Sequence, residues 1–168
     1  MSDITPQDIV NPAAGFPFVF VDAIIDTLKS WMPSHQIVPR GLRVTDSAQS
    51  IGVFPATWAE IPNTKEMGHI EGVENRYTLK IQVMRKSMDE AMGRAQFAND
   101  SKLVRVILYR DPTLQVRLGG LQEVLLGSSE MVQRFGVMRQ QFETSELAGS
   151  FTFLSITDYI IDTSITRI

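Results

Sequence analysis

The sequence predicts a single α+β domain in which helices pack on one face of an antiparallel sheet. Apolar residues recur at helical spacing near the start of the chain, and they alternate with polar residues over Val73 to Arg85. Residues typical of strands fill the C-terminal segment. Such alternation indicates an antiparallel sheet covered on one side only. The expected order is one helix, short strands, a long loop, a strand, a helix pair and final strands, which gives the α+β class.

Length and composition support one compact domain. The chain has 168 residues, of which 43% are hydrophobic and 21% charged, and both fractions are ordinary for globular proteins. Nine Phe, two Trp and three Tyr supply bulky side chains for a core. A disordered chain lacks such groups, so we expect the protein to fold.

The N-terminal segment predicts a flexible arm over residues 1–15, followed by the domain over 16–168. Pro6, Pro12 and Gly15 disfavour regular structure there. A frayed tail and an arm that docks on a neighbouring subunit are both compatible with this composition. If the arm docks, its apolar contacts are Ile4, Ile9 and Val10.

A helix is expected to begin at Pro17. Its apolar face recurs at three- and four-residue steps, and Pro33 ends it because the residue before a proline is displaced from helical geometry. The apolar residues are Val21, Ile24, Ile25, Leu28, Trp31 and Met32.

Prolines and glycines then break the chain into short strands, predicted at Gly41–Val44 and Ile51–Phe54. A long loop is predicted at about residues 55–72. Loops of that length in a compact domain are typically functional or mobile.

The second half begins with a helix that Ser87 and Glu90 are expected to start as a capping box. Residues 99–101 are a potential break in it. Residues 103–110 fit either a strand or a helix, and we favour a helix ended by Asp111-Pro112. Strands are then expected over residues 124–126, 131–142 and 150–162, with 143–149 as a hairpin connection.

Composition argues against several functions. The chain has no cysteine, which removes disulfides, thiolate metal sites and cysteine nucleophiles. The net charge is −3 and the basic residues are scattered, so binding of nucleic acid is not expected beyond passage through an assembly. No apolar run approaches the roughly 20 residues that span a bilayer. The first residues lack the pattern of a signal peptide. We therefore expect a soluble protein without a membrane partner.

No catalytic centre, metal site or cofactor site is expected. His35 and His69 each stand alone in the sequence, without ligands at metal-binding spacing. Asp22 and Asp26 share a helix face that is expected to lie in solvent. No serine lies in a Gly-x-Ser-x-Gly motif. The alternative, a small enzyme, would require Asp22 with Asp26, or His69 with Glu71, to converge in a pocket.

The remaining features favour assembly. Trp58 is a large apolar residue in a segment predicted to be exposed, which is typical of interface anchors. The free edges of the predicted sheet are templates for pairing between chains. The predicted interface residues are Ile4, Ile9, Val10, Trp58, Ile61, Met67 and Ile70.

Four segments in this order resemble the tail terminator proteins of long-tailed bacteriophages, over most of the chain from about Phe16. They are the opening helix through residues 18–26, the strand at 77–83, the helical run closed by residues 111–114 with Gly119-Gly120, and the terminal strand at 149–153. The arm and the 55–72 segment have no assigned counterpart in the family.

The resemblance implies a structural virion protein rather than an enzyme, forming a ring, commonly a hexamer, at the head-proximal end of the tail. Its implied partners are other copies of itself, the tail tube protein, and the connector or neck proteins of the head. The implied location is the virion tail, reached from the host cytoplasm during assembly. Three alternatives remain: a head-completion or neck protein that binds the portal, a small α+β enzyme, and a cellular interaction domain.

Overall fold

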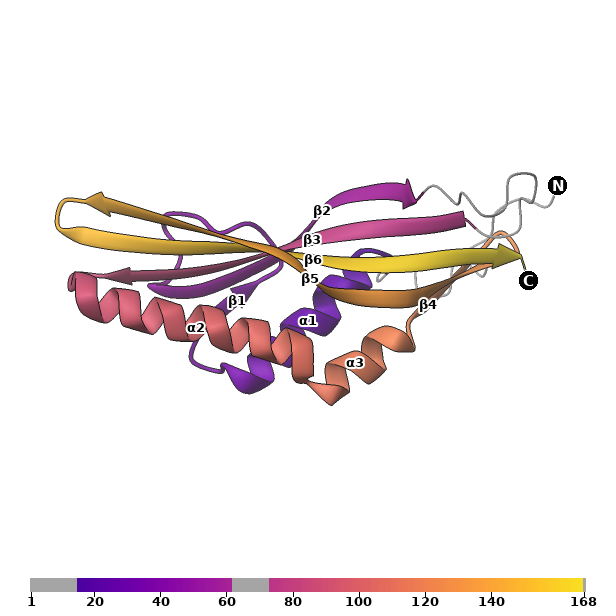
Figure 1. The fold of residues 1–168 in the computed structure, drawn as a ribbon, viewed down its shortest axis with the longest axis horizontal. Coiled ribbons are helices and arrows are strands. Elements are labelled where there is room, and N and C mark those ends of the chain that lie inside the picture. Colours follow the sequence, from indigo (N-terminus) through magenta and orange to yellow (C-terminus); the bar gives the residue numbers. More distant parts are fainter. Residues whose placement is uncertain (1–14, 62–72, 168) are drawn as a thin grey trace.

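The computed structural model of the protein describes residues 15–61 and 73–167, which form one six-stranded sheet and three helices (Figure 1). The helices are α1 (Phe18–Trp31), α2 (Glu90–Arg110) and α3 (Pro112–Gly119). The strands are β1 (Gln36–Val38), β2 (Gln49–Ile61), β3 (Val73–Ser87), β4 (Gln122–Leu125), β5 (Ser128–Leu147) and β6 (Ser150–Arg167). No helix in the described ranges is long and apolar enough to cross a membrane.

The sheet is mixed, so the expectation of a purely antiparallel sheet was wrong. Its strand order is β1-β2-β3-β6-β5-β4. Every neighbouring pair is antiparallel except β1 and β2, which run parallel. Parallel strands need a crossover instead of a tight hairpin. The chain makes this crossover through residues 39–48. The strand predicted at Gly41–Val44 was wrong, because these residues form no strand. The α+β class itself is confirmed.

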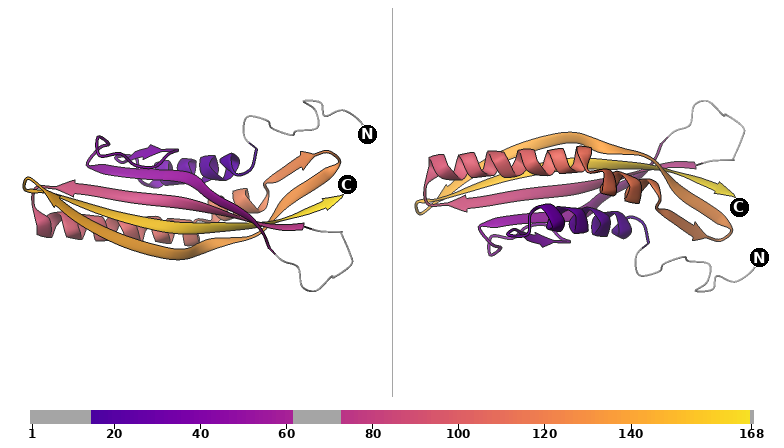
Figure 2. Two further views of the ribbon diagram at one scale, coloured as in Figure 1. Left: turned by 90° about the horizontal axis from the view of Figure 1, so that it is seen from above. Right: turned by 90° about the horizontal axis from the view of Figure 1, so that it is seen from below.

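All three helices lie on one face of the sheet, as expected (Figures 1 and 2). The sheet twists strongly. In Figure 1, β2 lies above β5 at one end of the molecule and below it at the other. The helices and the sheet enclose a core to which α1 contributes Phe20, Ile24 and Leu28, and the sheet contributes Ile51, Ile81 and Tyr159.

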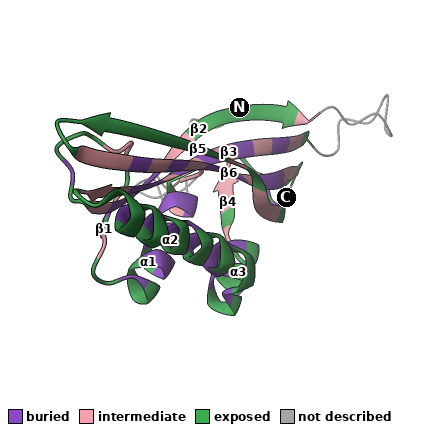
Figure 3. Ribbon diagram, turned by 60° about the vertical axis from the view of Figure 1, so that its left-hand side comes forward, coloured by how far each residue is buried: buried purple, intermediate pink, exposed green. Residues whose placement is uncertain are grey.

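Strand β3 confirms the alternation read from the sequence. From Asn75 to Val83 its residues are alternately buried and half-buried, and Figure 3 shows buried and half-buried bands along the central strands. In the neighbouring β6 the alternation extends from Phe153 to Thr157. The buried side chains face the helices. The half-buried ones lie on the opposite surface, which we call the open face.

Helix α2 begins at Glu90 with Asp89 as its N-cap, so the predicted capping box, with Ser87 as the cap, was wrong. The Asp89 side chain accepts a hydrogen bond from the backbone N–H of Met92, while the Ser87 hydroxyl accepts one from the backbone N–H of Asp89. An aspartate at this position satisfies an otherwise free helix donor. The helix continues without a break through residues 99–101, and it ends at Arg110, before the Asp111-Pro112 pair.

Gly93 allows α2 to approach the sheet closely. A Cβ at this position would lie 2.6 Å from the Ser87 Cβ and 2.9 Å from the Phe153 ring. Both distances are shorter than real carbon contacts, so only glycine fits without displacement.

The predicted loop at 55–72 is wrong for its first part, because residues 55–61 continue strand β2. They pair with β3 as far as Ile61 opposite Glu74, and a bulge between Pro55 and Thr57 accommodates the proline. Proline is tolerated at bulges and on edge strands. Residues 62–72 lie outside the described residues.

The C-terminal hairpin is longer than predicted. Residues 143–147, expected in a connection, extend β5, and the turn to β6 is made by Ala148 and Gly149 alone. Both have positive φ, 52° and 80°, which matches the two-residue hairpin turn whose twist suits the flanking strands.

Candidate assembly surface

The sheet has two long edges that carry no neighbouring strand within the described ranges. On β5, only residues 128–131 are covered by β4, which leaves residues 133–147 paired on one side to β6. On β2, β1 covers only residues 50–52, which leaves residues 53–61 paired on one side to β3. Such edges present unpaired N–H and C=O groups and are templates for another chain.

The β2 edge is exposed and nearly uncharged. Residues 56–60 are exposed, and Glu60 is the one charged side chain in residues 53–61. Trp58 is 60% exposed, which agrees with its prediction as a surface group. An exposed apolar edge of this kind lacks the lysines that proteins commonly use to block strand addition.

The β5 edge is mixed in character. Most of its side chains from Met138 onward are exposed, and Met138, Phe142 and Leu147 are large apolar groups at least half exposed. Two bulges lie in this strand, at Val132/Arg134 and at Val137/Arg139. Bulges bend a strand and increase its twist, which shapes the edge that another chain would meet.

Two buried carboxylates organise the charges on the open face. Asp162 accepts hydrogen bonds from the Arg76 Nε at 2.8 Å and from Arg134, and Asp158 accepts one from the Lys80 Nζ. The Arg139 Nε lies 3.4 Å from the second Asp158 oxygen. Each carboxylate therefore faces two cations, and this cluster carries a surplus of positive charge.

The pKa of Asp162 reflects this arrangement. Burial works to raise it, but the guanidinium groups of Arg76 and Arg134 outweigh burial and hold the pKa below its usual value. Beside these groups is a polar pocket of about 360 Å³. Its lining residues are Glu74, Gln133, Arg134, Asp162, Thr163 and Ser164.

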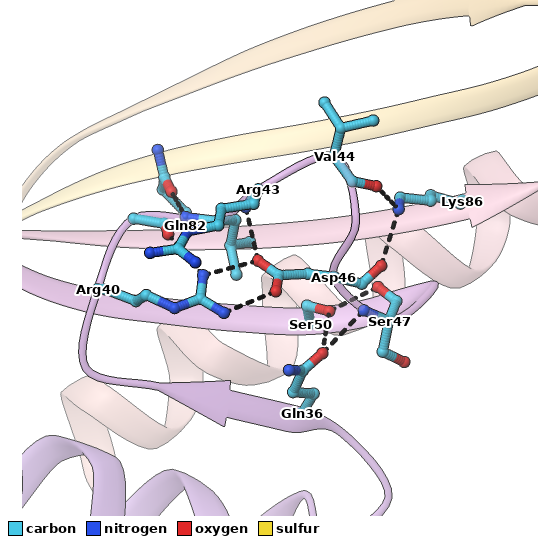
Figure 4. Close-up of polar contacts among 11 residues, drawn as sticks. Gln36, Arg40, Arg43, Val44, Asp46, Ser47, Ser50, Gln82 and Lys86 are labelled. Atoms are coloured by element: carbon cyan, nitrogen blue, oxygen red, sulfur yellow. Dashed lines mark hydrogen bonds and ion pairs between the residues drawn. The ribbon is translucent and has the colours of Figure 1, made fainter.

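The crossover between β1 and β2 covers the other part of the open face and is held by one acidic residue (Figure 4). The Asp46 carboxylate accepts hydrogen bonds from both terminal nitrogens of Arg40, at 2.8 and 2.9 Å, and from the backbone N–H of Arg43. These donors, the Arg40 guanidinium first among them, hold the pKa of Asp46 well below its usual range. Lys86 donates to the backbone carbonyls of Val44 and Asp46.

Gly52 permits the crossover to lie against the sheet. A Cβ on Gly52 would come within 2.4 Å of the Arg40 carbonyl oxygen and 3.1 Å of the Leu42 side chain. The Gln82 side chain accepts a hydrogen bond from the Leu42 backbone N–H and fixes the same segment to β3. The crossover is therefore a tightly bound cover of β2 and β3.

A buried carboxylate also lies on the helix side of the sheet. Glu130 accepts hydrogen bonds from the Tyr77 hydroxyl, the Asn75 amide and the Thr163 hydroxyl. Burial first, and then the Glu130 carboxylate, raise the pKa of Tyr77. These hydrogen bonds join β3, β5 and β6, so we assign the buried Glu130 carboxylate a structural role in holding the three strands together.

His35 is more than the isolated loop histidine that the sequence indicates. Its side chain is buried, and its Nε2 lies 3.3 Å from Asp100 on α2, which also binds Arg85 on β3. Burial of Asp100 opposes ionisation, but His35 and Arg85 outweigh it and keep the pKa of Asp100 low. This contact joins residues 65 positions apart by their numbers, so spacing along the chain gives no signal for it.

The alternative of a small enzyme requires Asp22 with Asp26, or His69 with Glu71, to converge in a pocket. Asp22 and Asp26 are exposed on α1, and Asp26 pairs with Arg117 of α3 at 3.0 Å. His69 and Glu71 lie outside the described residues. In the described ranges no group of three or more His, Asp or Glu side chains could hold a metal ion.

Among the predicted interface residues, Trp58 and Ile61 lie on the free β2 edge. Ile4, Ile9, Val10, Met67 and Ile70 lie outside the described residues. The β5 edge was missed as a specific surface. Its available signal was the apolar residues Met138 and Phe142 within a predicted strand.

Two solved structures are similar to this chain at low sequence identity. A chain in the virion of a native gene transfer agent particle is 11% identical with a TM-score of 0.45, and the match covers 88% of this chain and 99% of that chain. A second solved chain is 10% identical with a TM-score of 0.40, covering 89% of this chain and 92% of that one. No family model and no curated protein sequence matches this chain.

Proposed function

We propose that this protein is a structural virion protein, a tail terminator that forms a hexameric ring on the tail tube. The observation that supports assembly is the sheet with two unlike free edges, one on β2 and one on β5. Two unlike surfaces on one subunit suit head-to-tail contacts, which close into a ring when the rotation per subunit closes. The terminator role comes from the resemblance in the order of elements.

The elongated shape of the domain suits two different ring faces. The β5–β6 turn lies at one end of the molecule, and the end of β6 and the β4–β5 turn lie at the other (Figure 1). In a ring whose strands run along the axis, these ends form opposite faces. One face would bind the last ring of tube protein and stop elongation, and the other would bind the connector or neck of the head.

This function needs no covalent chemistry and no cofactor. The predicted contacts at Ile4, Ile9, Val10, Met67 and Ile70 belong to the proposal, as does the arm over residues 1–15. The protein would assemble in the host cytoplasm and remain at the head-proximal end of the virion tail.

The test is to purify the protein and examine it by light scattering and negative-stain microscopy, alone and with the tube protein of the same virion. We expect rings with a central opening, and rings bound at one end of tubes whose growth has stopped. A strictly monomeric protein in both samples, with tubes that grow unchanged, would contradict the proposed function.

A further inference from the structure

We propose that copies of this chain join by adding strand β5 of one copy to strand β2 of the next, in antiparallel orientation. This inference rests on the proposed ring and specifies the interface within it. The partner is a second copy of the chain, and the contact is a continuous sheet across the subunit boundary.

Strand direction supports this pairing. β2, β3, β6 and β5 are each antiparallel to the next, so β5 runs opposite to β2. Rotation about an axis parallel to the strands does not change their direction. The β5 edge of one copy therefore meets the β2 edge of its neighbour as an antiparallel pair, without inverting either copy.

Ring symmetry also fixes the reference register. A closed ring has no rise along its axis, so residues at the same level in one sheet remain level in the next copy. Across the sheet, Trp58 is level with Tyr77, Tyr77 with Ile161, and Ile161 with Phe135. Trp58 thus lies opposite Phe135 of the neighbouring copy. A tilt of the strands changes this register in steps of two residues if the faces are kept.

Strands β1 and β4 each cover part of an edge, so the contact between copies is limited to the uncovered residues of β2 and β5. β1 blocks β2 at residues 50–52, and β4 blocks β5 at residues 128–131. In the reference register, residues 53–59 of β2 are level with residues 140–134 of β5. Each stretch contains one bulge, so the number of paired residues is the same on both sides.

The side chains of these stretches are compatible. Arg139 is level with Phe54, and Arg134 with Ala59, so no like charges oppose each other. Residues 134–140 carry two arginines and residues 53–59 carry no charged side chain, so the contact brings no like charges together. Trp58 with Phe135 adds an aromatic cross-strand pair, which is among the more stabilising pairs in sheets.

The chain has no cysteine, so introduced cysteines can map the contact directly. Thr57 is level with Gly136, Thr57 is exposed, and a Cβ at Gly136 meets nothing within 4 Å. We expect Thr57→Cys mixed with Gly136→Cys to cross-link under mild oxidation, while neither variant cross-links alone. The double variant should give a ladder that ends at the closed ring. Arg139→Cys and Arg134→Cys, each paired with Thr57→Cys, test the registers shifted by two residues, because Met138 is the extra residue of the bulge and has no partner.

A second measurement uses Trp58→Lys, since Trp58 is exposed and its replacement leaves the core unchanged. The ring fraction should fall roughly tenfold or more, as for the loss of a central aromatic anchor. Val106→Lys, on the exposed side of α2, is the matched control and should leave the ring fraction unchanged.

The outcomes separate the two proposals. Rings that show none of these cross-links would overturn the β5–β2 contact, and so would Gly136→Cys copies that cross-link mainly to one another. Neither result would contradict the proposed ring itself. A protein that forms no ring with or without tube protein would overturn the proposed function.

Discussion

Replacing Asp162 by asparagine tests the charge cluster on the open face. The carboxylate is 3% exposed and binds Arg76 and Arg134, whose side chains are 38% and 64% exposed. A hydrogen bond to a charged group contributes about 1.5–3 kcal/mol. Because both arginines can turn toward water when the charge is lost, we expect Asp162→Asn to cost about 1–2 kcal/mol of unfolding free energy.

Urea unfolding followed by far-ultraviolet circular dichroism measures this cost. With a denaturant dependence of about 2 kcal/mol per molar urea, the midpoint should fall by about 0.5–1 M at pH 7. Glu143→Gln is the matched control. Glu143 is an exposed β5 carboxylate with no ion pair in the part of the chain that the structure describes, so its midpoint should stay within error.

The pH dependence of the difference follows from the direction of the pKa. Since the pKa of Asp162 is lower in the folded protein than the unfolded value of about 3.9, its stabilisation is complete above that value. It is lost as the pH falls through the folded pKa. The difference between wild type and Asp162→Asn should therefore shrink as the pH is lowered from about 5 to 3. Equal midpoints at pH 7, or a difference that grows in acid, would refute this account.

Four further substitutions test close approaches and turns. Gly93→Ala should destabilise the protein by about 1–3 kcal/mol despite the better helix propensity of alanine, whereas Gly119→Ala, where an added Cβ meets nothing, should be neutral or stabilise by up to about 1 kcal/mol in the same urea assay. Ala148→Gly should raise the thermal midpoint, by about 1 kcal/mol of stability, because glycine tolerates the positive φ of this turn; an unchanged or lower midpoint would argue against the turn. Gly52→Ala should displace the Arg40 backbone and cost about 1–3 kcal/mol, seen as faster proteolysis of the crossover; protection equal to wild type would contradict the packing.

The sequence by itself determined the elements with strong periodicity. The apolar spacing that ends at Pro33 predicted α1, and the alternation from Val73 predicted β3, because a buried face imposes its period on the residues. The helical interpretation of residues 103–110 was also confirmed, since α2 runs to Arg110.

Only the tertiary structure decided which segments pair and what they leave uncovered. Residues 55–61 were predicted as a loop because Pro55 interrupts them, but pairing with β3 offsets that local preference and extends β2. The contact between His35 and Asp100 and the pairing of Arg76 with Asp162 join distant parts of the chain. The free edge of β5 depends on which strands lie beside it. Spacing along a sequence reports which face a residue occupies, whereas the neighbours across a sheet depend on strand order, which local periodicity does not encode.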